Sequence, residues 1–127
     1  MEIKKKILLV EDDQSLAEVY RSRLEMEGFE VVTVHDGEVA VSEVINHRPD
    51  LIILDAMLPK ISGFDLLDII RGTPEVMNVR VIMLTALSQS SDRERAESLG
   101  ADDYLVKTQI TIGDVVNSVR KHLDIPS

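Results

Sequence analysis

Two segments of the chain are apolar almost from end to end, and they restrict its fold more than any other feature. Residues 50–55 read DLIILD and residues 79–85 read VRVIMLT. A strand with one face in water alternates apolar and polar residues, whereas a strand covered on both faces is apolar throughout. We therefore predict that both segments are strands of a sheet whose two faces are covered.

Short strand-like runs alternate with segments of helical spacing along the whole chain. Strands are predicted at residues 5–11, 29–35, 50–55, 79–85 and 103–107. Helices are predicted at residues 14–26, between a cap at Asp36 and a stop at Pro49, and at residues 63–72, 90–100 and 111–123. Five β–α units imply a parallel sheet, and a closed eight-stranded barrel needs about twice this length. The remaining fold class is an open, doubly wound α/β sheet, whose ligand site lies beyond the carboxyl ends of its strands.

One helix start and one helix face can also be predicted. Thr111 with Asp114 three residues later suits a capping box at the start of the last helix. The residues expected on one side of the first helix are Leu16, Val19, Tyr20, Arg23 and Leu24.

The composition excludes several classes of function. With 14 basic and 23 acidic side chains, the formal net charge is −9. This balance argues against direct binding to nucleic acid or to an anionic membrane surface, because both depend on Lys and Arg. The absence of cysteine excludes disulfides and thiolate metal sites. No apolar run approaches the roughly 20 residues of a membrane-spanning helix, and no signal peptide is evident, so we expect a cytoplasmic protein.

Polar residues gather where the predicted strands end, at one edge of the sheet. They are Glu11, Asp12 and Asp13 after the first strand, Asp55 at the end of the third, Thr85 at the end of the fourth and Lys107 at the end of the fifth. Carboxylates within about 4–6 Å of one another need a counter-cation. Oxygen ligands without Cys or His favour Mg²⁺, which also binds phosphate oxygens. A carboxylate can itself accept a phosphoryl group, and Asp55, alone at the end of a central strand, is best placed for that role.

Each of these residues also has a simpler interpretation. Asp13 can cap the following helix, Thr85 can be an ordinary strand residue, and Lys107 can be a solvated lysine. Their joint placement at four strand ends favours a site. The three histidines, His35, His47 and His122, are scattered, and we expect them at the surface.

Four motifs in order carry a resemblance to a known family: LLVEDD (8–13), LIILDAMLPKISG (51–63), VIMLTA (81–86) and GADDYLVK (100–107). Together they resemble the receiver domain of two-component response regulators, over essentially all 127 residues, which we take as a single domain, residues 1–127. The resemblance implies a flavodoxin-like (βα)5 fold with five parallel strands in the order 2-1-3-4-5.

The resemblance also implies roles for individual residues. Asp55 would be the phosphoacceptor, Lys107 would pair with it or with its phosphoryl group, Thr85 would be the switch hydroxyl, and Tyr104 would be the aromatic residue that turns inward on activation. The implied metal is Mg²⁺, for which Mn²⁺ can substitute. Its ligands would be Asp12, Asp55 and the backbone carbonyl of Met57, with Glu11 acting through water.

The implied partners are a sensor histidine kinase or phosphotransfer protein, and a downstream target or output domain. Kinase recognition would involve Gln14, Ser15 and Glu18, and output would use the surface of the fourth helix, fifth strand and fifth helix. A homodimer that forms on phosphorylation would rest on charges, because the helix at 90–100 is polar. Either a stand-alone regulator or a receiver from a longer protein fits, and the chain ends favour the first.

Two features refine this pattern. The family usually has proline after the lysine, joined by a cis bond, whereas Thr108 follows Lys107 here. Because a cis bond costs about 2.5–4 kcal/mol before residues other than proline, we predict a trans peptide and an altered loop. In the family that this chain resembles, the side chains two residues after the acceptor and two after the threonine influence the access and orientation of the water that hydrolyses the phosphoryl group. Here they are Met57 and Leu87, which are apolar and cannot hydrogen-bond that water. We therefore predict slow autodephosphorylation.

Three rival interpretations remain open. A flavin-binding protein of similar architecture would need a Ser/Thr/Gly-rich anion loop after the first strand, where this chain has three acids. An aspartate-based phosphatase typically has a second Asp two residues after its nucleophile, where this chain has Met57. A degenerate receiver would bind partners without being phosphorylated, and the complete set of Asp12, Asp55, Thr85 and Lys107 disfavours it.

Overall fold

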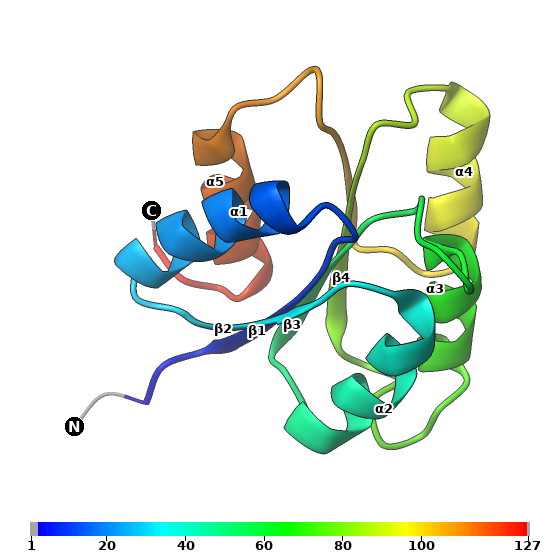
Figure 1. Ribbon diagram of the computed structural model, residues 1–127, viewed down its shortest axis with the longest axis horizontal. Coiled ribbons are helices and arrows are strands. Elements are labelled where there is room, and N and C mark those ends of the chain that lie inside the picture. Colours follow the sequence, from blue (N-terminus) through cyan, green and yellow to red (C-terminus); the bar gives the residue numbers. More distant parts are fainter. Residues whose placement is uncertain (1–2, 127) are drawn as a thin grey trace.

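The computed structural model describes residues 3–126, which form one five-stranded sheet with helices on both faces (Figure 1). All strand pairs are parallel, in the order β2-β1-β3-β4-β5, as the resemblance implied. The strands are β1 (Lys6–Val10), β2 (Glu30–Val34), β3 (Leu51–Leu54), β4 (Arg80–Thr85) and β5 (Asp103–Val106). The helices are α1 (Gln14–Met26), α2 (Gly37–His47), α3 (Gly63–Arg71), α4 (Ser90–Ser98) and α5 (Ile112–His122).

The sheet separates two apolar clusters, and this explains why the central strands are apolar throughout. Helices α1 and α5 cover one face and helices α2, α3 and α4 cover the other (Figure 1). In β3, Leu51 and Ile53 pack in the α1/α5 cluster, whereas Ile52 and Leu54 pack in the opposite cluster. All four side chains are at most 1% exposed, so both faces of this strand need apolar residues.

Local capping signals work as the sequence predicted. Asp13 accepts a hydrogen bond from the Leu16 N–H (3.1 Å) and begins α1. At α5, Thr111 and Asp114 form a capping box. Helix α2 ends at His47, and Arg48 follows in the left-handed conformation (φ 45°) just before Pro49. Caps are short-range contacts, and for this reason they can be read from the sequence.

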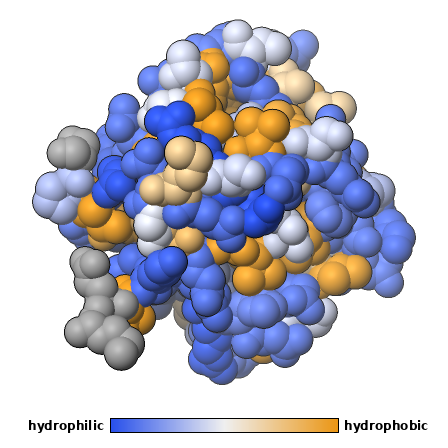
Figure 2. All heavy atoms as spheres, turned by 60° about the vertical axis from the view of Figure 1, so that its left-hand side comes forward, coloured by the Kyte–Doolittle hydropathy of each residue, from blue (hydrophilic) through white to orange (hydrophobic). Residues whose placement is uncertain are grey.

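The buried side of α1 differs at one apolar position from the helix face predicted from the sequence. Val19 is 54% exposed, and Ala17 occupies the buried side together with Tyr20 and Leu24. Figure 2 shows the side of the molecule on which α1 lies, where apolar side chains form separate patches among hydrophilic ones. Within residues 3–126, no helix has the length and apolar character needed to cross a membrane.

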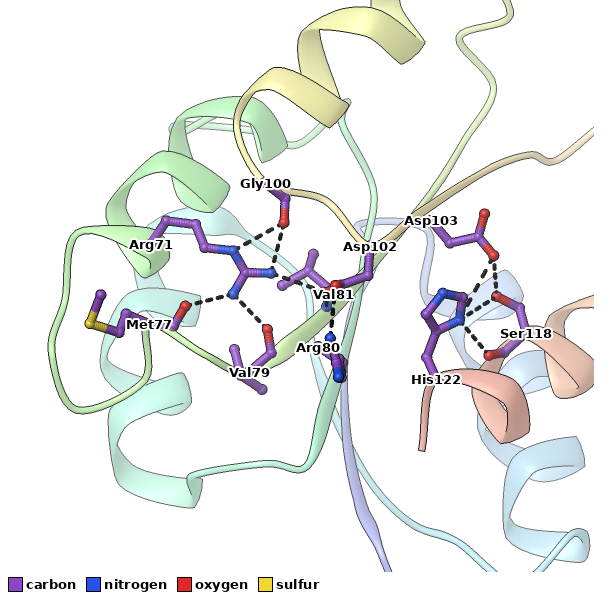
Figure 3. A network of polar contacts seen from close by, with 10 residues as sticks. All are labelled: Arg71, Met77, Val79, Arg80, Val81, Gly100, Asp102, Asp103, Ser118 and His122. Carbon is purple, nitrogen blue, oxygen red and sulfur yellow. Dashed lines mark hydrogen bonds and ion pairs between the residues drawn. The ribbon is translucent and has the colours of Figure 1, made fainter. Parts of the chain in front are cut away.

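Arg71, the last residue of α3, ties together the edge of the sheet where the strands begin (Figure 3). Its guanidinium donates to the carbonyl oxygens of Met77, Val79 and Gly100 and to Asp102 Oδ2, at 2.6–3.1 Å. The same Asp102 oxygen accepts a hydrogen bond from the Val81 N–H (2.8 Å). One side chain thus joins α3, the segment before β4 and the turn before β5. The residues expected to be functional lie at the opposite edge of the sheet, where the strands end.

Candidate functional site

The acidic residues at the carboxyl edge of the sheet come together because β1 and β3 are direct neighbours. Val10 pairs with Leu54, and the Asp55 N–H donates to the Val10 carbonyl (3.1 Å), so the residues after both strands lie side by side. Glu11, Asp12 and Asp55 each place one carboxylate oxygen within 4.8 Å of the others. Glu11 and Asp55 are 2% and 5% exposed, and Asp12 is exposed.

Lys107 supplies the positive charge of this site. Thr85 pairs with Val106 in the β4–β5 ladder, and the Lys107 N–H continues that ladder by donating to the Thr85 carbonyl (2.8 Å). From this position its ammonium donates to Glu11 Oε1 at 2.5 Å and to Asp55 Oδ2 at 2.7 Å. Three carboxylates face one ammonium, so negative charge remains in excess and a bound cation would offset it.

Burial and pairing act in opposite directions on the titration of Glu11 and Lys107. Burial raises the pKa of Glu11, and hydrogen bonds from Lys107 and from the Asp13 N–H offset only part of this increase. Burial lowers the pKa of Lys107, but its hydrogen bonds to Asp55 and Glu11 outweigh the burial, and the pKa is raised. Lys107 is therefore a cation at neutral pH.

The donor set at this edge fits a hard divalent cation. Its side-chain donors are carboxylate oxygens, which Mg²⁺ prefers, and one of the three residues is exposed and can keep water in the coordination sphere. The Met57 N–H donates to Asp55 Oδ1 (2.9 Å), so the backbone of residue 57 lies beside the same carboxylate. The ligand role of the Met57 carbonyl stays a prediction.

Gly63 contributes to the site in a way that the sequence did not indicate. A Cβ atom at this position would lie 2.0 Å from the Asp55 carbonyl oxygen and 2.7 Å from the Ala56 Cα. The Gly63 N–H also donates to the Ala56 carbonyl (2.9 Å). In the sequence this glycine is the last residue of the motif LIILDAMLPKISG and the boundary of a helix. In the structure it lets α3 start directly against the residue that carries the central carboxylate.

Thr85, Leu87 and Tyr104 form a second part of this edge. The fully buried Thr85 hydroxyl accepts a hydrogen bond from the Leu87 N–H (3.4 Å), and the Tyr104 hydroxyl donates to the Leu87 carbonyl (2.8 Å). Tyr104 is 2% exposed, which is the inward position. A movement of Tyr104 on activation, like the switch role of Thr85, stays a prediction.

The peptide after Lys107 is trans, because no peptide bond within residues 3–126 is cis. This confirms the prediction based on Thr108. A short turn follows, in which the Gln109 N–H donates to the Val106 carbonyl (2.9 Å).

A serine, a histidine and an aspartate also meet between β5 and α5, where Figure 3 shows Ser118, His122 and Asp103. The Ser118 hydroxyl donates to Asp103 Oδ2 (2.6 Å), while His122 Nδ1 lies 2.8 Å from the Ser118 carbonyl. The Ser118 hydroxyl also lies 3.5 Å from His122 Nδ1, but both groups have a shorter contact elsewhere, the hydroxyl to Asp103 and the imidazole to the Ser118 carbonyl. A nucleophilic serine needs its hydroxyl closely bonded to the imidazole, so we interpret this arrangement as a structural link between β5 and α5. The His122 side chain is 14% exposed, so it is partly buried rather than fully at the surface as expected.

The geometry defines a class of protein: an open five-stranded α/β fold with an acidic cluster and one lysine at the strand ends. Residues 7–120 match the family model of the response regulator receiver domain. The chain is 46% identical to the phosphate regulon transcriptional regulatory protein PhoB of Rhizobium meliloti over 102 residues, which cover 80% of this chain and 45% of the relative. The chain therefore spans less than half the length of this relative.

Solved structures agree with this assignment. The receiver domain of the Francisella response regulator 1452 superposes with a TM-score of 0.89 at 28% identity, covering 95% of this chain and 98% of the other. The receiver domain of the sensor histidine kinase PA1611 from Pseudomonas aeruginosa PAO1 superposes with a TM-score of 0.87 at 30% identity, covering 96% and 99%. That structure is described with a magnesium ion coordinated in its active-site cleft. This chain belongs to the response regulator receiver domain family of two-component signalling.

Proposed function

We propose that the chain accepts a phosphoryl group from the phosphohistidine of a histidine kinase or phosphotransfer protein onto Asp55, in a reaction that depends on Mg²⁺. The observation that supports this most strongly is the Lys107 ammonium, bonded to both Asp55 and Glu11 inside a cluster of three carboxylates. The carboxylates of this cluster favour a bound metal cation, and the metal and the Lys107 ammonium together favour the negatively charged oxygens of a phosphoryl group.

In the proposed reaction, a carboxylate oxygen of Asp55 forms a bond to phosphorus while the bond from phosphorus to the histidine nitrogen breaks, and the nitrogen keeps the electron pair. Mg²⁺, when bound, would offset negative charge on the phosphoryl oxygens. Asp12, Asp55 and the Met57 carbonyl would hold it, with Glu11 acting through water. Lys107 would exchange its Asp55 contact for a phosphoryl oxygen, and Thr85 would donate its hydroxyl to another.

For output, we propose that Thr85 and its loop carry the change to the surface of α4, β5 and α5. The hydrogen bond from Tyr104 to the Leu87 carbonyl links this loop to β5 and supports that route. Gln14, Ser15 and Glu18 are exposed at the start of α1, next to the acidic cluster, and would contact the kinase. A downstream protein or an output domain would read the α4–β5–α5 surface.

Intact-mass spectrometry after incubation with acetyl phosphate, with and without Mg²⁺, tests the proposal. We expect one phosphoryl adduct that needs Mg²⁺ and is absent from the Asp55→Asn variant. An adduct that persists in the variant would place the acceptor elsewhere. No adduct under either condition would instead favour a degenerate receiver that binds its partners without phosphorylation.

A further inference from the structure

The loop between β3 and α3 contains a turn that few residues adopt. The Ile61 N–H donates to the Pro59 carbonyl (2.8 Å), and Lys60, the residue between them, has a φ of 71°. A hydrogen bond between residues two positions apart, with a positive φ at the residue between them, defines the rare and strained form of the γ-turn. A side chain with a Cβ avoids positive φ, so the conformation persists only where the surrounding structure holds it.

Gly37, the first residue of α2, lies against this turn. A Cβ atom at Gly37 would be 2.4 Å from the Ile61 carbonyl oxygen and 3.0 Å from the Ile61 Cβ. The nearest atom belongs to the backbone, so no side-chain rotation could relieve the contact. Helices α2 and α3 lie on the same face of the sheet (Figure 1), and Gly37 lets the start of α2 contact the loop that leads into α3.

Asp36, the cap of α2, holds the same turn from a second direction. Its Oδ1 accepts the Val39 N–H (2.9 Å), and its Oδ2 lies 3.7 Å from the Lys60 ammonium. The hydrogen bond from Val39 and the charge of Lys60 lower the pKa of Asp36. The side chain that starts α2 therefore also faces the central residue of the strained turn.

The other end of the loop is bonded to the central carboxylate of the site. The Met57 N–H donates to Asp55 Oδ1, and only three residues separate Met57 from Ile61. The Gly63 N–H donates to the Ala56 carbonyl (2.9 Å), and Gly63 packs against the Asp55 carbonyl, so the end of the loop beyond Ile61 is also held. We therefore expect a shift of Ile61 to move the segment toward Met57 more than the segment beyond Gly63.

We propose that Asp36 and Gly37 are positioning residues for the cation site: they hold the loop of residues 57–61 so that the Met57 backbone stays beside Asp55. This inference deepens the proposed function and depends on it, because it assigns the affinity for Mg²⁺ partly to the start of α2. Neither residue needs to contact the metal.

The Gly37→Ala variant tests the inference, with Gly113→Ala as its matched control. Gly113 also lies in the first turn of a helix, but a Cβ there meets only the Thr111 hydroxyl oxygen at 3.5 Å, an ordinary contact. The dissociation constant for Mg²⁺ is measured by amide NMR titration, at a temperature where wild type and variants are all folded. Mutation of residues that orient metal ligands typically weakens the affinity for the metal by about 10–100-fold. We therefore expect Gly37→Ala to weaken Mg²⁺ binding roughly tenfold. Gly113→Ala should match wild type.

A second variant keeps the test decisive if Gly37→Ala does not fold. Asp36→Ser retains a capping side chain and removes the charge that faces Lys60. Glu38→Gln, exposed in the same turn of α2, removes one charge without touching the loop and serves as its control. Because the pair is partly exposed, we expect about twofold weaker Mg²⁺ binding in Asp36→Ser than in Glu38→Gln.

The outcomes separate this inference from the proposed function. If wild type binds no Mg²⁺, the proposed function fails. If wild type binds Mg²⁺ and a folded Gly37→Ala binds it equally well, the inference is overturned and the proposed function stands. If Gly37→Ala is unfolded, equal affinities of Asp36→Ser and Glu38→Gln overturn the inference, and a weaker affinity of Asp36→Ser supports it.

Discussion

Replacing Lys107 with methionine removes the one ammonium of the site and keeps most of the volume of its side chain. Two buried carboxylates, Glu11 and Asp55, then lose the cation to which each is bonded at 2.5 and 2.7 Å. We expect this variant to fold less stably at neutral pH in the absence of Mg²⁺.

The size of the loss follows from the carboxylate separation. Oxygens of Glu11 and Asp55 lie within 4.8 Å of each other, which at an effective dielectric constant of about 20 gives about 3 kcal/mol of repulsion. Removing one partner of a buried ion pair costs a similar amount, about 3–5 kcal/mol. We therefore expect the free energy of unfolding to fall by about 3 kcal/mol.

The stability that Lys107→Met loses should also depend on pH, in a direction set by the pKa of Glu11. Burial raises the pKa of Glu11 above its ordinary value of 4.5, and the hydrogen bond from Lys107 lowers it. Without Lys107 the pKa rises further, so the folded variant binds a proton more readily than the unfolded chain. A carboxyl group of this kind destabilises the fold above its folded pKa, and the penalty disappears as the pH falls toward 4.5. The deficit of the variant should therefore shrink between about pH 7.5 and about pH 5.

Urea unfolding followed by circular dichroism measures this deficit at both pH values, with and without Mg²⁺. Lys121→Met, at an exposed position on α5, is the control and should lose no more than about 0.5 kcal/mol. Saturating Mg²⁺ should narrow the deficit of Lys107→Met, because a metal replaces the missing charge. A loss equal to that of the control, or a deficit unaffected by both pH and Mg²⁺, would refute the electrostatic account.

Three further predictions concern other parts of the molecule. Arg71→Leu removes the hub of hydrogen bonds in Figure 3 and should lower the free energy of unfolding by about 3 kcal/mol without changing acetyl phosphate labelling of the folded protein. Arg80→Leu, which loses one half-exposed contact, should cost less than about 1 kcal/mol in the same urea titration, and equal losses would contradict this assignment. Tyr104→Phe loses the hydrogen bond to the Leu87 carbonyl and should cost about 1 kcal/mol in thermal unfolding, whereas an unchanged stability would mean that this bond contributes nothing. Wild type should lose its phosphoryl group slowly, whereas Met57→Asn, whose side chain can hydrogen-bond water, should lose it several-fold faster. The decay of the adduct is followed by mass spectrometry, and rapid loss from wild type would argue against the role of Met57.

The sequence predicted the features that depend on neighbours along the chain. The apolar runs of β3 and β4 predicted strands covered on both faces, and Asp13 and Thr111 were recognised as caps because each bonds a backbone N–H three residues away. The strand-end rule also predicted that Asp55 and Lys107 would share one edge of the sheet.

Contacts between distant segments were not predictable in this way. Val19 has the spacing of a buried residue, but the path of α1 over the sheet buries Ala17 instead. The close contacts of Gly37 and Gly63 were not predicted, although Gly63 ends one of the quoted motifs, because the backbone atoms that they approach belong to other elements. The role of Arg71 depends on the carbonyl of Gly100, 29 residues further along the chain.

The sequence by itself thus determined which elements form, where they are capped and which chemical groups stand at the strand ends. The family resemblance implied a pair between Lys107 and Asp55, but only the tertiary structure decided that the same ammonium also bonds Glu11, so that one lysine joins residues 96 and 52 positions away along the chain. The physical reason is the separation along the chain over which each kind of interaction acts. Propensity, burial period and capping act over a few residues, whereas a contact of 2.5–2.7 Å between three strands depends on the register of the whole sheet.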